Sequence, residues 1–315
     1  MFLKVRELNL YERYILEVKE RCWIEKYDED NLFTLEKGLR GEEYFYYMFK
    51  DCAGGAKIWD LRLKHKGRNQ YDFIIVSKGR IVHFDTKYYE GHYNYVNGIF
   101  KSKSDYVISN PLFKLETQHA RLKLLVDKLG LDYEVKSYVV FVGEQFQVTG
   151  YNGDDRILFD QDLKKIFKSL NTVEVTSEDI QVARMLMEYH DDSDEYQRIF
   201  YYEFEEMKKG VKCPKCRNFL PSNRNRLKKV KCQCGCEFTK KEIVKLAFDA
   251  IYLLKNRGVT VGDIAMFSGI GRTTIKEVLK NKCQRIGIQR GSKYIPDNKD
   301  AFIIKEDEAF YLCDE

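Results

Sequence analysis

Apolar and polar positions follow two different periods over the first part of the chain. Residues 10–27 and 31–50 carry Leu, Tyr and Phe at helical spacing, which predicts two helices. Shorter apolar runs follow at 57–65, 71–77 and 80–88, and their pattern is typical of strands. Two helices followed by three strands indicate a domain that combines helices with a sheet.

The elements that follow complete this predicted domain. Residues 91–109 are rich in aromatic side chains and fit another hairpin. Pro111 begins a helix that Gly130 closes, and further strands are expected at 138–142 and 146–152. The order of elements predicts a compact α/β domain that ends with the last of these strands.

The second half of the chain changes character three times. A mostly helical and then acidic segment suits a connector, a cysteine cluster follows, and helical periodicity then returns before a short β pattern. The predicted parts are an α/β domain at 1–150, a connector at 151–209, a cysteine module at 210–239 and a helical module at 240–315, the last all-α or ending in a wing-like hairpin.

The net charge of +5 is unevenly spread along the chain. Residues 208–231 hold ten Lys or Arg and no acid, and residues 272–293 hold seven against Glu277 alone. Residues 188–206 hold eight acids against Arg198 alone. Charge runs are commonly solvated surface, but two basic blocks that coincide with recognisable motifs favour a polyanionic partner.

Composition also bears on where the protein works. No run of about 18 apolar residues occurs, so we expect no membrane span. The first twenty residues carry charges throughout and lack the apolar core of a signal peptide. Nine cysteines in such a chain favour reduced thiols or metal ligands over disulfides. We therefore expect a cytoplasmic protein.

One predicted hairpin carries candidate chemistry. A two-residue turn at Lys78-Gly79 would place Asp72 opposite Asp85, with Cβ atoms about 4.5–5.5 Å apart. Lys87 shares a strand face with Asp85. Two such acids repel each other, and a divalent cation such as Mg²⁺ would relieve the repulsion. A shifted register would instead put the acids on different faces of the sheet. The other alternative is that both acids simply end their strands at the solvent.

A third acid lies in the second predicted helix. Gly38 and Gly41 interrupt its pattern, at a cost of about 1 kcal/mol each relative to alanine. Glycines in such positions often allow another backbone to approach closely. Glu42 could then face the strands, or Glu42 and Glu43 could be an ordinary exposed pair.

The segments GLRGEEYFYYMF, QYDFIIV and IVHFDTKYYEG, in this order, resemble the nuclease-related domain (NERD), a branch of the PD-(D/E)XK nuclease superfamily. The resemblance covers residues 36–142. It implies a restriction-endonuclease-like core, in which helices flank a mixed sheet, and metal-dependent cleavage of DNA phosphodiesters. Asp85 departs from the pattern, because NERD more often has glutamate there.

The resemblance also implies roles for particular residues. Glu42, Asp72 and Asp85 would hold Mg²⁺ or Mn²⁺, and Lys87 would lie beside the attacking water. Gln118, in the helix segment NPLFKLETQ, would position the lysine or the substrate.

The cysteine cluster resembles a zinc ribbon. Cys213 and Cys216 form a C-P-x-C knuckle, and C-Q-C-G-C follows after a basic stretch. Five cysteines compete for the four positions of tetrahedral Zn²⁺. We favour Cys232 and Cys234 with the first pair, and Cys236 is the alternative. A full shell of four thiolates favours a structural role over a catalytic one.

The last module resembles a helix-turn-helix. A long helix ends at Gly258, Thr260 caps a short helix, and Gly269 makes the turn to a third helix, which would lie in the major groove. The alternative is a module for packing or dimerisation. The residues expected to face DNA, from the third helix and the wing-like hairpin, are Arg272, Thr273, Thr274, Lys276, Lys280, Arg290 and Lys293.

These features together favour a metal-dependent DNA endonuclease, with double-stranded DNA delivered by the zinc ribbon and the helix-turn-helix. A homodimer would suit cutting of both strands. The alternatives are a DNA-binding regulator that uses the nuclease fold as a scaffold, and a ribonuclease.

Overall fold

The protein is described here by a computed structural model that covers residues 1–64, 67–143, 145–191, 193, 199–221, 228–280, 283–287 and 291–296. The chain divides into two compact units. The first consists of Met1–Arg6 and Phe33–Glu195, and the second of Glu7–Leu32 and Tyr196–Glu315. Each unit is therefore assembled from two separate stretches of chain. Among the helices of the described residues, none is both long and apolar enough to cross a membrane.

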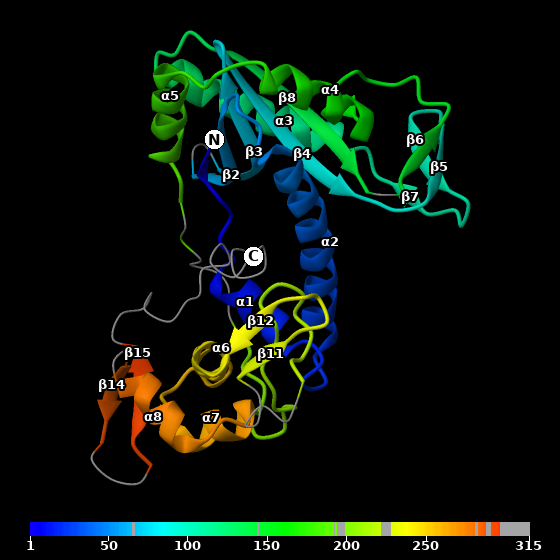
Figure 1. The fold of residues 1–315 in the computed structure, drawn as a ribbon. Coiled ribbons are helices and arrows are strands. Elements are labelled where there is room, and N and C mark those ends of the chain that lie inside the picture. The colour runs from blue at the N-terminus through cyan, green and yellow to red at the C-terminus, as the bar shows by residue number, and fades with distance from the viewer. Residues whose placement is uncertain are drawn as a thin grey trace. The chain divides into compact units, whose positions relative to one another are not determined.

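A six-stranded sheet forms the centre of the first unit (Figure 1). Its strands are Phe2–Lys4 (β1), Ala56–Lys64 (β2), Arg68–Ser77 (β3), Arg80–Tyr88 (β4), Glu134–Val142 (β8) and Ile157–Leu158 (β10). Their order in space is β1-β2-β3-β4-β8-β10. The pairs β2–β3 and β3–β4 are antiparallel, and the other neighbours are parallel. The sheet is mixed, which confirms the predicted fold class.

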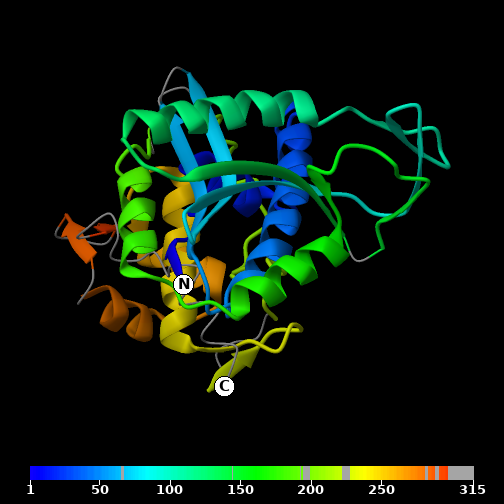
Figure 2. The same cartoon turned by 90° about the horizontal axis from the view of Figure 1, so that it is seen from above.

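Helices cover both faces of this sheet. They are α2 (Lys26–Phe49), α3 (Leu112–Lys128), α4 (Asp160–Asn171) and α5 (Ser177–Met187). α2 and α4 bury Phe45 and Leu163 against one face. α3 and α5 bury Leu122 and Leu186 against the other. Figure 2 shows α3 and α4 on opposite sides of the strands. Burial on both faces explains why the central strands are almost continuously apolar.

A second, smaller sheet follows the main sheet's β4. Its strands are His92–Val96 (β5), Ile99–Ser102 (β6), Val107–Ile108 (β7) and Gln147–Thr149 (β9), in the order β7-β6-β5-β9. β5 and β6 form an antiparallel hairpin around Asn97 and Gly98, which both have positive φ angles. The aromatic segment at 91–109 thus contains the hairpin that its pattern suggests.

The domain boundary differs from the one predicted at residue 150. β10, α4 and α5 follow that position, yet they belong to the first unit, so the predicted connector at 151–209 is wrong for its first part. β10 pairs with β8, and the apolar sides of both helices pack on the main sheet. Helical periodicity shows that a segment has an apolar side, but it cannot show which surface that side covers.

The second unit combines four helices with two small sheets. Its helices are α1 (Leu10–Val18), α6 (Lys240–Lys255), α7 (Val261–Ser268) and α8 (Arg272–Lys280). Its strands are Lys229–Lys231 (β11), Glu237–Thr239 (β12), Val259–Thr260 (β13), Cys283–Ile286 (β14) and Lys293–Pro296 (β15). β11 pairs with β12, and the other three form a sheet in the order β13-β15-β14. β14 and β15 pair as an antiparallel hairpin, so this module follows the wing-like alternative rather than the all-α one. Only the two-residue strand β13 was not predicted, because so short a strand leaves no periodic pattern.

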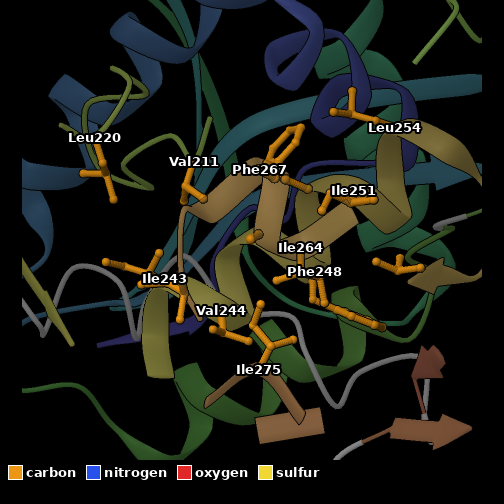
Figure 3. Close-up of a cluster of buried hydrophobic side chains, with 14 of the residues drawn as sticks. Val211, Leu220, Ile243, Val244, Phe248, Ile251, Leu254, Ile264, Phe267 and Ile275 are labelled. Atoms are coloured by element: carbon orange, nitrogen blue, oxygen red, sulfur yellow. The ribbon is translucent and has the colours of Figure 1, made fainter. Parts of the chain in front are cut away.

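One apolar core holds the second unit together (Figure 3). Ile243, Phe248 and Ile251 of α6 lie in it with Ile264 of α7 and Ile275 of α8. The core also contains Tyr14 and Val18 of α1, which the sequence had assigned to the first domain. α7 begins at a capping box of Thr260 with Asp263 and ends at Gly269 in the left-handed conformation, as the sequence predicts for these two positions.

Gly41 lets α2 approach β4 closely. A Cβ atom at Gly41 would lie 3.1 Å from Tyr88 Cβ and 3.4 Å from a methyl carbon of Val142. A Cβ atom at Gly38 would meet nothing within 4 Å. The expected close approach therefore holds for Gly41 and is wrong for Gly38.

The two glycines allow a matched test of this packing. Gly38→Ala should raise the free energy of unfolding by about 0.5–1 kcal/mol, because it adds a Cβ in open space and reduces the freedom of the unfolded chain. Gly41→Val should lower it by about 1–3 kcal/mol, because the branched side chain overpacks the contact with β4. Urea unfolding followed by circular dichroism measures both changes, and equal effects at the two positions would contradict the packing role of Gly41.

Candidate active site and candidate metal centre

The predicted turn between β3 and β4 sets the geometry of the candidate active site. Lys78 and Gly79 have φ angles of 50° and 70°, as expected for a two-residue hairpin turn. Ser77 pairs with Arg80, which confirms the predicted register. The ladder between these strands ends at Phe73 and Phe84, one position before the acids.

The Asp72 side chain accepts hydrogen bonds just beyond the end of the β3–β4 ladder. Its Oδ2 accepts hydrogen bonds from the backbone N–H of Thr86 at 2.8 Å and from the Thr86 hydroxyl at 3.0 Å. The carboxylate thus satisfies a buried backbone donor that a neighbouring strand would otherwise satisfy. β3 and β4 separate here, so the acids do not form the directly opposed ladder pair that the simple hairpin predicts.

Asp85 is the most deeply buried acid of the site, with 1% of the residue exposed. It lies on β4, which pairs with β8 along its whole length, from Arg80 to Tyr88. Lys87 Nζ donates to Asp85 Oδ2, and Lys114 Nζ donates to Oδ1 at 3.1 Å. Burial alone would raise the pKa of Asp85, but the two ammonium groups outweigh it and hold this pKa below its usual range.

Lys114 is a residue that the sequence analysis missed. It lies on α3, one i, i+4 step before Gln118. Since Gln118 had already been placed at the site, the helical period would have placed Lys114 on the same side of this helix. The sequence gives no sign, however, that its ammonium contacts Asp85.

Glu42 is buried beside the other two acids. Arg6 Nη1 donates to Glu42 Oε1, and the indole N–H of Trp59 donates to Oε2 at 2.7 Å. Burial raises the pKa of Glu42 to about 7, with a smaller contribution from the charge of Asp72, although Arg6 acts in the opposite direction. The alternative of an exposed Glu42–Glu43 pair is therefore wrong for Glu42.

The chemistry of these acids suits a hard divalent cation. Burial raises the pKa of Asp72, and the neighbouring charge of Asp85 raises it further. Buried carboxylates that repel one another are the donors that Mg²⁺ or Mn²⁺ stabilises best. Their oxygens are nevertheless held by Arg6, Thr86 and lysines, and among the described residues the three acids do not form a group with all ligand atoms within 4.8 Å.

Gln118 joins α3 to β3 rather than to the lysine. Its Nε2 donates to the Gln70 carbonyl at 2.7 Å, and the Tyr71 hydroxyl donates to the Gln118 carbonyl at 3.0 Å. Gln118 Oε1 is buried and has no hydrogen-bond partner within the described part of the chain. His83 is fully buried against the Tyr71 ring, and burial lowers its pKa to about 3. His83 is therefore a neutral side chain packed in the core.

Four of the five clustered cysteines gather in the second unit. The Sγ atoms of Cys213, Cys216, Cys232 and Cys234 all lie within 4.8 Å of one another. Cys213 Sγ lies 3.6 Å from Cys234 Sγ, and Cys216 Sγ lies 3.4 Å from Cys232 Sγ. A tetrahedron of thiolates about 2.3 Å from Zn²⁺ has sulfurs about 3.8 Å apart, so the cluster is compatible with a zinc site. Cys236 is buried next to it, 3.4 Å from Cys234 Sγ.

The backbone around these cysteines forms two turns. Arg217 N–H donates to the Cys213 carbonyl at 2.8 Å, and Gly235 N–H donates to the Cys232 carbonyl at 3.0 Å. Gly235 has a φ of 97°, which explains why glycine stands in the second turn. β11 and β12 flank this turn as an antiparallel hairpin.

The helix predicted to contact DNA is α8. Arg272, Thr273, Lys276 and Lys280 are exposed on it, and Thr274 is half-buried. Ile275, Val278 and Leu279 of the same helix face the core. Lys293 is exposed on β15, whereas Arg290 lies outside the described residues. α8 therefore presents a basic side opposite its apolar side.

Comparison with known families identifies the domain that contains the acids. The family model described as the nuclease-related domain (NERD) matches residues 37–142. This range contains all five residues predicted from the resemblance and also Lys114. The chain thus carries a nuclease-related domain, as the sequence analysis predicted, while Arg6, the cysteine cluster and α8 lie outside the match. No curated protein and no solved structure was found to match the chain.

Metal analysis tests the cysteine cluster. Cys213→Ser should lose stoichiometric zinc and destabilise the second unit, because a structural zinc site contributes directly to folding. Cys22→Ser is the matched control, since Cys22 is half-buried beside the core of the same unit but lies outside the cluster. Elemental analysis of the purified proteins, with thermal unfolding, measures both effects. Full zinc occupancy in Cys213→Ser would contradict the assignment.

Proposed function

We propose that the protein is a metal-dependent endonuclease that hydrolyses phosphodiester bonds in DNA. The observation that carries the proposal is the cluster at the open end of β3 and β4, where buried Asp72 and Asp85 lie with Lys87. This cluster lies within the nuclease-related match. Burying two neighbouring carboxylates beside an ammonium carries a desolvation cost, and such arrangements are concentrated at functional sites.

In this proposal Asp72 and Asp85 hold Mg²⁺ or Mn²⁺ together with Glu42. Such an ion, when bound, polarises the phosphate and lowers the pKa of a bound water. Thr86 orients Asp72 through two hydrogen bonds, and the parallel pairing of β4 with β8 fixes the position of Asp85. The acids are therefore held by the sheet rather than by loops, which limits the reorganisation that the reaction requires.

Lys87 is the residue best placed to act on the reacting atoms. Its ammonium contacts Asp85, and 27% of its side chain is exposed, so it reaches from the acids to the surface. At that position it orients the attacking water and offsets the negative charge that develops on the phosphate. Gln118 acts indirectly, by holding the start of β3 against α3.

The second unit would bring DNA to the nuclease domain. The order α6, β13, α7, α8, β14 and β15 supports a winged helix-turn-helix, in which α8 would be the recognition helix. The exposed cations of α8 and the basic cysteine module supply phosphate contacts. We assign Zn²⁺ to Cys213, Cys216, Cys232 and Cys234, where it stabilises the fold of the module.

Plasmid cleavage tests the catalytic assignment. Purified protein should cut supercoiled DNA with Mg²⁺ or Mn²⁺ and not with EDTA. Lys87→Ala should reduce the rate by about a hundredfold or more, because it removes a charge that stabilises the transition state. Lys123→Ala should leave it unchanged, since Lys123 is exposed on α3 away from the acids. The nuclease function would be contradicted if the unmodified protein binds DNA but cleaves no substrate with either metal. The substrates tested would include duplex DNA, single-stranded DNA and RNA.

Salt-dependent binding tests the delivery role. Combining Arg272→Ala with Lys276→Ala should weaken DNA binding and reduce the slope of log affinity against log salt by about two, because two phosphate contacts are lost. Glu277→Ala on the same helix should not weaken binding. Fluorescence anisotropy with a labelled duplex measures the slope at several salt concentrations. An unchanged slope in the double variant would show that α8 does not face the phosphates.

A further inference from the structure

Asp85 is held by two cations that differ in origin. Each carboxylate oxygen accepts from one lysine, Oδ2 from Lys87 and Oδ1 from Lys114. Lys87 lies two residues after Asp85 on the same strand, so β4 fixes the position of its backbone relative to Asp85. Lys114 comes from α3, and 61% of its side chain is exposed. Its flexible stem can therefore turn into solvent without disturbing the sheet.

The Lys114 ammonium also lies within the field of the other acids. Burial by itself would lower the pKa of Lys114, but Asp85 raises it, and Asp72 and Glu42 raise it further. A single positive charge attracted by all three acids is located where a divalent cation would be attracted most strongly.

We propose that Lys114 is the built-in counterion of the acid cluster, which occupies the cation position at Asp85 in the metal-free protein and must leave before a divalent metal binds. This inference rests on the proposed metal-dependent function and concerns its regulation. A divalent ion carries two positive charges and the ammonium carries one, so the acids attract the metal more strongly. The metal must nevertheless break the ion pair between Lys114 and Asp85, and it therefore binds only when its concentration is high enough to offset the free energy of that ion pair. Lys114 thereby sets the metal concentration at which the site fills, and the displaced ammonium is left beside the acids, near the phosphate position.

Metal binding without nucleic acid tests the exchange. Lys114→Met keeps most of the side-chain length and removes the charge, so the variant should bind Mn²⁺ at least about fivefold more tightly, the low end of ordinary coupling between two ligands. Lys123→Met is the control on the same helix and should bind like the unmodified protein. The zinc-loaded full chain is titrated with Mn²⁺, and free Mn²⁺ is followed by electron paramagnetic resonance. Thiolate sites bind this hard ion poorly, so the measured Mn²⁺ binding reports on the carboxylates rather than on the cysteine cluster.

Asp85→Asn separates the two hypotheses. If Mn²⁺ binding disappears in Asp85→Asn but is not tighter in Lys114→Met, the counterion proposal fails and the proposed metal-dependent function stands. If neither the unmodified protein nor Lys114→Met binds Mn²⁺ in an Asp85-dependent way, the metal-dependent function fails and the counterion proposal fails with it.

Thermal unfolding gives a second readout that a purely structural lysine would not produce. In metal-free buffer Lys114→Met should unfold at a lower temperature, because Asp85 keeps only one of its two cations. Saturating Mn²⁺ should remove most of this difference, since the metal replaces the lost charge in both proteins. A difference that stays constant with Mn²⁺ would overturn the proposal.

Discussion

The hydrogen bonds from Thr86 to Asp72 are the interactions on which the rest of the site depends. They satisfy the first backbone donor beyond the β3–β4 ladder, and so they allow two strands to separate inside a buried sheet without leaving that donor unpaired. β4 continues along β8 after the separation, which keeps Asp85 in place while its neighbouring strand moves away. The acids therefore lie directly beyond the end of the β3–β4 ladder, on strands whose other pairings continue.

Charge balance explains the composition of the acid cluster. Three acids from α2, β3 and β4 are matched by three cationic side chains, Arg6 on Glu42 and two lysines on Asp85. Such matching limits the cost of burying charge, although it rarely makes a net contribution to stability. The cysteine cluster differs from the acid cluster in its chemistry. Its soft thiolates, with Sγ atoms 3.4–3.6 Å apart, suit an ion that stays bound rather than one that exchanges.

The parts of this structure that local sequence encodes were predictable. The Lys78-Gly79 turn, the register it sets and the glycine at position 41 follow from two or three neighbouring residues each. Arg6, Trp59 and Lys114 were not predictable as partners of the acids, because they come from β1's exit, β2 and α3, and only the tertiary fold brings them to the site. The domain boundary failed for the same reason, since an amphipathic helix such as α4 does not specify which surface it covers.

The interleaving of the two units has a consequence for how the chain folds during synthesis. α1 is synthesised more than 200 residues before its core partner α6. The nuclease-related unit can close around its sheet as soon as α5 has emerged, whereas α1 must wait with its apolar side uncovered until the last third of the chain is available. The long sequence separation of this contact makes the second unit the slower one to complete.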